Sequence, residues 1–120
     1  MIIGKIDALM SLVPTAEYHL KSDGTLDWLD KSITEPTSTA IDAEVTRLTN
    51  AEPLRLLRLE RNIRLTACDW TQSRDLTLSN DDDWKTYRQA LRDLPASASP
   101  KLNENGNLDM SSVTFPTEPS

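Results

Sequence analysis

PLRLLRLERNIRLTAC, residues Pro53 to Cys68, is the stretch of this sequence that decides the fold. At the 100° per residue of an α-helix, its apolar residues fall on two opposite sides. The first side carries Leu54, Leu57, Leu65 and Cys68, with Arg61 among them. The second side carries Leu56, Leu59, Ile63 and Ala67. Because a surface helix normally has one apolar stripe, two opposed stripes predict that this helix is in contact on both sides.

Two arrangements account for the paired stripes. Either one stripe faces the core and the other faces a partner chain, or the helix lies inside the fold between an N-terminal hairpin and the last helix. In the first arrangement, aspartates placed in the interface stripe leave a soluble monomer that does not assemble. In the second, each such change unfolds the chain. The sequence is compatible with both.

A separate helix is predicted upstream of Pro53. Pro36 and the hydroxyl-rich residues 37–39 offer an N-terminal cap. One apolar stripe follows: Ile41, Val45 and Leu48. Residues 49–52 weaken the pattern, and Pro53 suits the first residue of a new helix because its missing N–H is unpaired there in any case.

An N-terminal β-hairpin is predicted by residues 16–20 and 25–29, in which apolar and polar residues alternate on either side of Asp23-Gly24. One face of this hairpin carries Tyr18, Leu20, Leu26 and Trp28. Since a lone hairpin is only marginally stable in water, this face must cover another element.

The last helix is predicted from DDDWKTYRQALRDLP, residues 81–95. Asp81 to Asp83 suit its first turn, because the helix N-terminus carries partial positive charge, and Pro95 is expected to end it. Its apolar stripe is Trp84, Tyr87, Leu91 and Leu94. Successive helical residues diverge too far for the three aspartates to share a metal ion, so we expect no metal site here.

Residues 96–120 are rich in Ser, Pro, Asn and Thr, which is typical of an extended tail. Asn105-Gly106 indicates a turn, and residues 112–115 form a short β-prone island. A polar tail of this kind needs a structure to hold it, which is either this chain's own helices or a neighbouring subunit.

Composition limits the functional classes. Only 38% of the 120 residues are hydrophobic, so the core must be thin. The net charge of −6 argues against nucleic acid as a partner, and no apolar run is long enough to span a membrane. We expect no signal peptide, and the single cysteine, Cys68, fits a reducing compartment.

The charge is unevenly distributed. Residues 1–46 carry three Lys and eight Asp or Glu, for a net charge of −5. Residues 53–68 carry four Arg and one Glu, for a net charge of +3. The two segments could pair within the chain or between subunits, or could simply be solvated surfaces with ordinary helical charge spacing.

Residues for catalysis are scarce. His19 is the only histidine and lies in a predicted strand, and Cys68 lies among leucines on a helix face, so a nucleophile–base pair is not expected. Three glycines cannot build a phosphate-binding loop, and no Cys/His set has zinc spacing. We therefore expect a protein that is not an enzyme and that uses no cofactor. Trp70 and Trp84 either close a small core between the last two helices or lie at an interface, where tryptophan is enriched.

Three blocks of the sequence resemble tail assembly chaperone-like proteins of tailed bacteriophages, and the N-terminal part looks like the version carried by marine phages. The first block is residues 53–62 with 65–72, which include Cys68-Asp69-Trp70. The second is residues 84–95, with YRQALRDLP at 87–95, and the third is residues 113–116, VTFP, where Phe115 stands in place of the expected Trp. The resemblance covers residues 53–117 and implies a role in assembling tails or tail fibres.

Together these features predict an α+β fold with an N-terminal hairpin region (1–34), a three-helix region (35–95) and an extended tail with a short strand (96–120). The resemblance implies a non-enzymatic tail or tail-fibre accessory protein, assembled in the host cytoplasm and retained in the virion, with a transient assembly chaperone as the alternative. The partners would be other tail or tail-fibre proteins, and a homo-oligomer is a further option. The expected partner-binding residues are Leu56, Leu59, Ile63, Trp70, Trp84, Tyr87, Val113 and Phe115. Val113 to Phe115 could add as a strand to a partner's sheet, and deletion of residues 110–120 would test this.

Overall fold

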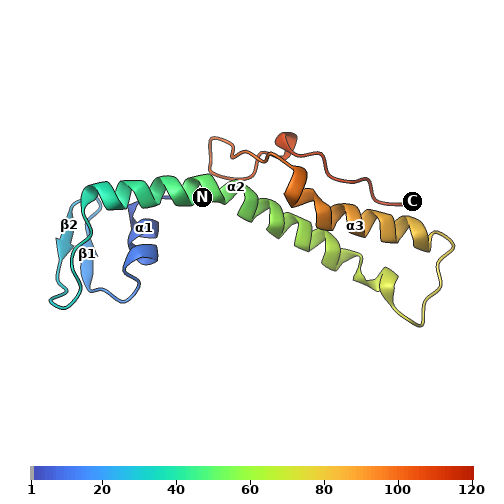
Figure 1. Ribbon diagram of the computed structural model, residues 1–120, viewed down its shortest axis with the longest axis horizontal. Coiled ribbons are helices and arrows are strands. Elements are labelled where there is room, and N and C mark those ends of the chain that lie inside the picture. The colour runs from blue at the N-terminus through green and yellow to red at the C-terminus, as the bar shows by residue number, and fades with distance from the viewer. Residues whose placement is uncertain (1) are drawn as a thin grey trace. The chain divides into compact units, whose positions relative to one another are not determined.

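The predicted hairpin is present in the computed structural model, which describes residues 2–120 (Figure 1). Strands β1 (Tyr18–Leu20) and β2 (Leu26–Trp28) are antiparallel, with Tyr18 opposite Trp28 and Leu20 opposite Leu26. The Tyr18 and Trp28 rings stack with centroids 5.9 Å apart. Gly24 takes φ +90°, which only glycine adopts without strain, and its N–H donates to the Lys21 carbonyl at 3.0 Å. Alternation and the Asp-Gly turn thus set the register, as predicted.

The apolar face of the hairpin covers two helices. One is α1 (Lys5–Leu12), and the other is the first part of α2 (Ser38–Ala67). Ala8, Leu9 and Ile41 are buried in this small core, and the hairpin leucines pack against them. The sequence analysis predicted only strands in the N-terminal third and missed α1, which has only eight residues. The Asp7 carboxylate caps this helix by accepting from the Gly4 N–H at 2.8 Å.

Asp30 organises the exit from the hairpin. Its carboxylate accepts from the backbone N–H groups of Glu17, Ser32 and Ile33, each at 2.9 Å. These N–H groups, with Glu17 contributing most, lower the pKa of Asp30 to about 2. The side chain therefore stays ionised in mild acid and keeps the turn closed there.

The prediction of two helices on either side of Pro53 is wrong, because α2 is continuous through that proline. Proline inside a helix costs one hydrogen bond, about 3 kcal/mol in general, yet its fixed φ is compatible with helical geometry. Beside it, the Glu52 carboxylate accepts from the Arg55 Nε at 2.7 Å, and one turn later the Leu57 side chain is completely buried.

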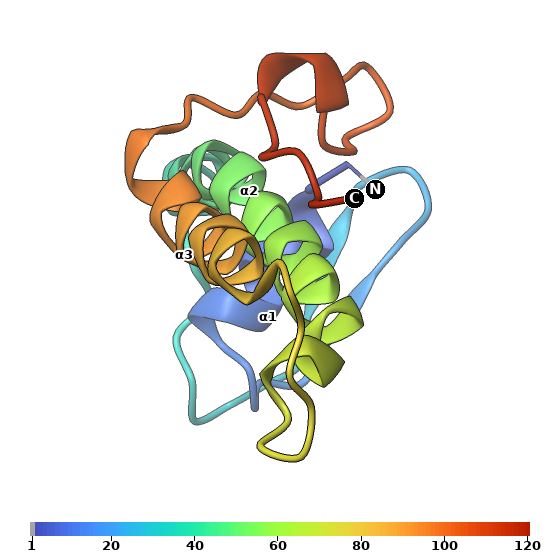
Figure 2. The same ribbon diagram turned by 90° about the vertical axis from the view of Figure 1, so that its right-hand side faces the viewer.

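The contacts divide the chain into two compact units, residues 1–51 and 52–120, so α2 contributes to both. In the second unit, Figures 1 and 2 show α3 (Asp81–Ser97) alongside the second part of α2. A short 3₁₀ helix, η1 (Asp69–Gln72), follows α2 directly. The core of the second unit consists of Cys68, Trp84, Tyr87 and Leu91, with Leu65 and Leu78 packed against it. The predicted apolar stripe of the last helix is therefore confirmed for Trp84, Tyr87 and Leu91, whereas Leu94 is half-buried and outside this core.

The first turn of α3 carries Asp81, Asp82 and Asp83, as predicted, and the Lys85 Nζ lies 3.0 Å from the Asp81 carboxylate. The prediction that Pro95 ends this helix is wrong by two residues, since α3 ends at Ser97. A proline so near the end of a helix removes the N–H donor of only one backbone carbonyl. The next turn still closes, since the Ala98 N–H donates to the Leu94 carbonyl at 3.0 Å.

The C-terminal segment, residues 98–120, is mostly extended, as expected. Leu102 and Leu108 form an isolated antiparallel bridge around a turn in which Gly106 takes φ +78°. A 3₁₀ helix, η2 (Met110–Ser112), follows. The prediction of a short strand at residues 112–115 is wrong, because Ser112 belongs to η2 and Val113, although extended, pairs with no strand among the described residues. An α+β fold with an N-terminal hairpin, helices and an extended C-terminal segment is confirmed.

Candidate protein-binding surface

The inner side of α2 in the second unit faces the core. The Leu57 side chain is fully buried, Cys68 is 2% exposed, and Leu65 packs against the α3 stripe. These are the residues of the first predicted stripe, at the spacing that a single buried face requires. This stripe therefore supplies the core of the unit and leaves the second one for the opposite side.

The outer side of α2 remains apolar and exposed. Leu59 is 48% exposed and Ile63 is 62% exposed, and together with Asn62 and Thr66 they line a shallow depression. Leu56 is half-buried at its edge. We call these five residues the outer face. Within the second unit, Leu59 and Ile63 are thus on the exposed side of α2, whereas the apolar face of the hairpin packs on residues of its own unit.

The eight expected partner-binding residues fall into three groups. Leu56, Leu59, Ile63 and Trp70 are exposed or half-buried on α2 and η1. Trp84, Tyr87 and Val113 are buried in the second unit, with exposed fractions of 6 to 9%. Phe115 is half-buried beneath the Arg64 guanidinium, which lies 3.9 Å from its ring centroid. The accessible members of the set are therefore on α2 and directly after it.

The aromatic residues of the second unit form one chain of contacts. Trp84 is edge-to-face with Trp70, at 5.7 Å between centroids, and with Tyr87, at 5.8 Å. Trp84 is inside the core, whereas Trp70 stays 55% exposed. Of the two interpretations, the core role fits Trp84, whereas Trp70 contacts the Trp84 ring and still presents an apolar surface.

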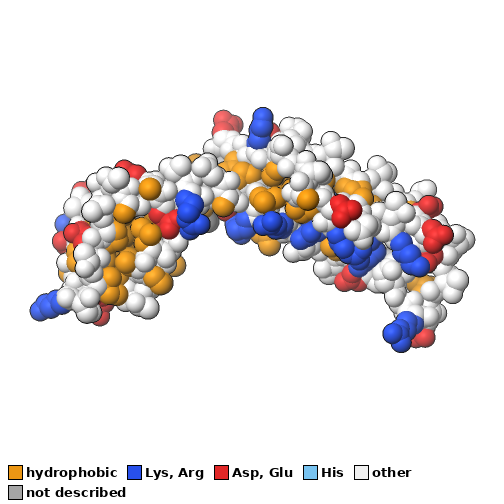
Figure 3. Space-filling view, viewed as in Figure 1, with side chains coloured by type: hydrophobic (Ala, Val, Ile, Leu, Met, Phe, Trp, Pro, Cys, Tyr) orange, Lys and Arg blue, Asp and Glu red, His pale blue; other side chains and the backbone are white. Residues whose placement is uncertain are grey.

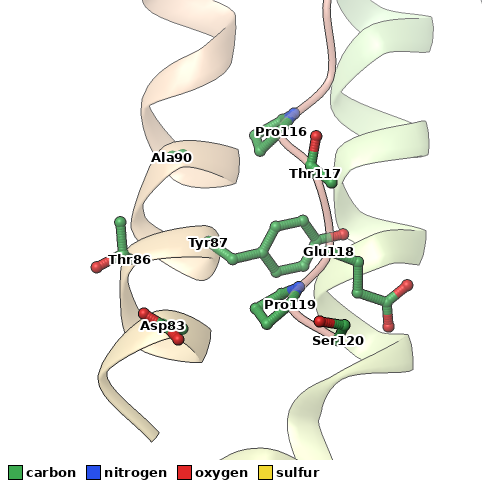
Figure 4. A pocket seen from close by; sticks show the side chains of 9 residues that line it. All are labelled: Asp83, Thr86, Tyr87, Ala90, Pro116, Thr117, Glu118, Pro119 and Ser120. Carbon is green, nitrogen blue, oxygen red and sulfur yellow. The ribbon is translucent and has the colours of Figure 1, made fainter. Parts of the chain in front are cut away.

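The C-terminal segment is held by this chain's own helices. It runs along α3, and Figure 4 shows Tyr87 projecting from α3 toward it, between Pro116 and Pro119. Asn80 donates to the Ser120 carbonyl at 3.2 Å. Burial raises the pKa of the Tyr87 phenol, and the nearby Glu118 carboxylate adds to the shift. Of the two ways to hold the tail, the structure shows the one within the chain.

Arg88 is a buried residue that the sequence reading missed. Its guanidinium donates to the Leu65 carbonyl at 3.0 Å, to the Cys68 Sγ at 3.1 Å and to an Asp69 carboxylate oxygen at 3.0 Å. Burial alone would lower the pKa of Arg88, but the contacts with Cys68 and Asp69 raise it. Its position in the sequence indicates burial, because Arg88 lies four residues after Trp84 and three before Leu91, which places it on the buried face of α3. Arg88 thus caps the C-terminal end of α2, where a cation is favoured.

Basic side chains border the outer face on one side. Arg55 and Arg58 are exposed and lie on the same side of the helix as Asn62, at 100° per residue. Figure 3 shows basic side chains beside apolar ones along the part of the molecule that the second part of α2 occupies. Arginines beside the outer face would favour a binding partner that carries negative charge at the same place.

The chain matches one protein family by its sequence. The family model of the phage tail assembly chaperone protein matches residues 54–120, which are nearly all of the second unit and more than half of the chain. No curated protein and no solved structure matches the chain. No helix among residues 2–120 is long and apolar enough to cross a membrane. The resemblance of residues 53–117 is thereby confirmed, and the chain belongs to the phage tail assembly chaperone protein family.

Proposed function

We propose that this chain is a non-enzymatic assembly chaperone that binds a phage tail or tail-fibre protein through the outer face of α2. The exposure of Leu59 and Ile63 carries the proposal. These side chains lie within the part of the chain that the family model matches, on an element whose opposite side already supplies the core. The family supports a role with tail proteins, and the exposed stripe supports this particular surface.

Covering the outer face stabilises the complex. Full burial of a Leu or Ile side chain is worth about 1.5–3 kcal/mol, and Leu59 and Ile63 are 48% and 62% exposed. A contact over three helical turns is smaller than a standard protein–protein interface of about 1,600 Å². Binding of moderate strength is therefore expected, with a dissociation constant on the order of micromolar.

The double variant Leu59→Asp/Ile63→Asp is expected to lose tail-protein binding while it stays folded. Two carboxylates cannot be buried against an apolar partner without a large desolvation cost, so binding should fall at least about a hundredfold. The measurement is mass spectrometry of the phage structural proteins that co-purify with the tagged full chain from infected cells, with far-UV circular dichroism to confirm the fold.

Met110→Asp is the matched control, because Met110 is 48% exposed in the same unit but lies on η2. It should bind as the unchanged chain does. Equal binding by the double variant and the unchanged chain would show that another surface meets the client.

We further propose that the chain stays in the virion after assembly in the host cytoplasm. The outer face supports this, since its apolar side chains stay out of water only while a partner is bound. Quantitative mass spectrometry of gradient-purified virions should find the chain at a fixed multiple of the tail symmetry. Its absence from particles, with abundant chain in infected cells, would instead identify a transient chaperone.

A further inference from the structure

We propose that the second unit contains a peptide-binding site in which residues 113–120 of a second copy replace the chain's own residues 113–120. Tyr87 of α3 and Arg64 of α2 form the site, and both belong to the second unit. The proposal does not rest on the contact with a tail protein, because the outer face of α2 lines a different depression.

Tyr87 contacts the two prolines of the segment. Figure 4 shows its ring directed between Pro116 and Pro119. In an extended polyproline-type chain with about three residues per turn, residues three apart lie on the same face, so both prolines can touch one ring. Segments of this kind bind aromatic side chains well, because their backbone is already extended before binding. The spacing of the two prolines therefore matches a site with one aromatic ring at its centre.

Arg64 holds the aromatic residue of the segment. Its guanidinium lies 3.9 Å from the centroid of the Phe115 ring, and its Nε donates to the Glu60 carboxylate at 3.1 Å. The ion pair with Glu60 keeps the guanidinium in place on α2, which lowers the cost of ordering the site when a segment binds. Val113, two residues before Phe115, is only 9% exposed. The segment is thus recognised by an aliphatic and an aromatic side chain followed by two prolines.

Side chains rather than the backbone attach the segment. Within residues 2–120, one hydrogen bond joins the backbone of residues 114–120 to the rest of the chain, from Asn80 to the Ser120 carbonyl at 3.2 Å. The core cluster around Trp84 and Leu91 includes no residue of the segment. The segment can therefore leave the site without breaking a sheet or removing a side chain from this core.

The connection to α3 permits such an exchange. Residues 101–112 form a turn that is closed by its own hydrogen bonds, such as the one from the Asp109 N–H to the Lys101 carbonyl at 2.8 Å. Residues 98–100 join this turn to α3, and Ala98 is extended, with φ −78° and ψ 154°. A rotation at residues 98–100 would move the turn and the segment together.

Concentration decides which copy supplies the segment. The segment of a second copy makes the same contacts as the chain's own, so exchange is a low-cost route to association. A short connection gives the chain's own segment an effective concentration on the order of millimolar. Free copies at micromolar concentration therefore keep their own segments, whereas copies gathered on a common partner exchange them. A donated segment leaves its own site open, so the exchange ends in a closed pair or ring.

Fluorescence polarisation with a labelled peptide of residues 111–120 tests the site in the full chain. The variant Phe115→Ser/Pro119→Ser loses the ring under Arg64 and one of the prolines at Tyr87, so its own segment should leave the site. This variant should bind the peptide at least about tenfold more tightly than the unchanged chain, whose own segment competes. Far-UV circular dichroism checks the fold, and Phe115→Ser alone replaces the double variant if that variant unfolds.

Two controls accompany this measurement. Thr114→Ser/Thr117→Ser changes exposed residues of the same segment and should bind the peptide as weakly as the unchanged chain does. When added to Phe115→Ser/Pro119→Ser, the change Arg64→Ser should weaken peptide binding at least about threefold, whereas Arg58→Ser, at an exposed arginine of the same helix, should not. Equal peptide binding by Phe115→Ser/Pro119→Ser and the unchanged chain would overturn the proposal.

Mixing two full chains tests the second copy as the donor. The Arg64→Ser chain keeps its segment but has a weakened site, and the Phe115→Ser/Pro119→Ser chain keeps the site but has lost the segment. At about 1 mM, sedimentation velocity should show heterodimers in the mixture and monomers in each component alone. A mixture that sediments as its components do would overturn the second copy as the occupant. In that case, displacement of the peptide by a purified tail protein would assign the site to the client. Neither outcome changes the test of the outer face, which Leu59→Asp/Ile63→Asp addresses separately.

Discussion

Trp84→Ala is expected to lower the free energy of unfolding of the second unit by about 3–5 kcal/mol. Trp84 is 6% exposed, lies in the core with Leu91 and Cys68, and makes edge-to-face contacts with two other rings. Its removal leaves a cavity between α2 and α3 that the thin core of this unit has few side chains to fill. Urea unfolding followed by far-UV circular dichroism measures the loss without relying on the fluorescence that the substitution removes.

Trp70→Ala is the matched comparison. Trp70 contacts the same Trp84 ring but is 55% exposed, so its removal should cost about 1 kcal/mol. Equal losses for the two variants would contradict the assignment of Trp84 to the core. The comparison also bears on binding, since Trp84 was an expected partner-binding residue: a binding defect of Trp84→Ala should follow its loss of structure, whereas a defect of Trp70→Ala should appear in a folded chain.

Arg88→Met is expected to lower the free energy of unfolding by about 2–3 kcal/mol. Methionine keeps the apolar part of the side chain, so the substitution removes only the guanidinium. That group donates hydrogen bonds to the Leu65 carbonyl, the Cys68 sulfur and the Asp69 carboxylate. Without it, the buried carbonyl at the end of α2 loses its donor. The loss is smaller than the full cost of breaking a buried ion pair because Asp69 is 62% exposed, and because Arg88 Nε has no described hydrogen-bond partner.

Arg92→Met serves as the control for this change. Arg92 is exposed on the same helix and donates to Gln89 at 3.2 Å, so its replacement should change the free energy of unfolding by less than about 0.5 kcal/mol. The Arg88 effect should persist at high salt, because a buried contact is screened little. A stability of Arg88→Met within error of the unchanged chain would show that the cap at the end of α2 contributes nothing.

Most of the correct structural predictions rest on the periodicity of apolar residues. The alternation around Asp23-Gly24 placed the hairpin in its observed register, and the spacing of Trp84, Tyr87 and Leu91 placed the buried face of α3. These patterns succeed because the side-chain periods of strand and helix follow from local backbone geometry. The paired stripes of Pro53 to Cys68 likewise separated Leu57 from Ile63, the one fully buried and the other largely exposed.

Local rules failed where distant contacts outweigh them. The proline rule divided α2 into two helices at Pro53, but α2 is continuous through it, and Leu57 one turn later is fully buried. The sequence analysis did not identify Arg88 as a core residue, but its guanidinium donates to the Leu65 carbonyl at the end of α2. Helix α1 was too short to recognise without the hairpin that covers Leu9.

By itself, the sequence determined the hairpin, the helical faces, the exclusion of obvious catalytic motifs and the resemblance that the family model confirmed. Only the tertiary structure decided which stripe of α2 is the core and which is open, because both have the same period and differ only in what packs against them. It also decided that Val113 and Phe115 lie against this chain's own helices, since a polar tail has no local preference strong enough to place it. Burial is a property of the folded chain, and it left Leu59 and Ile63 exposed.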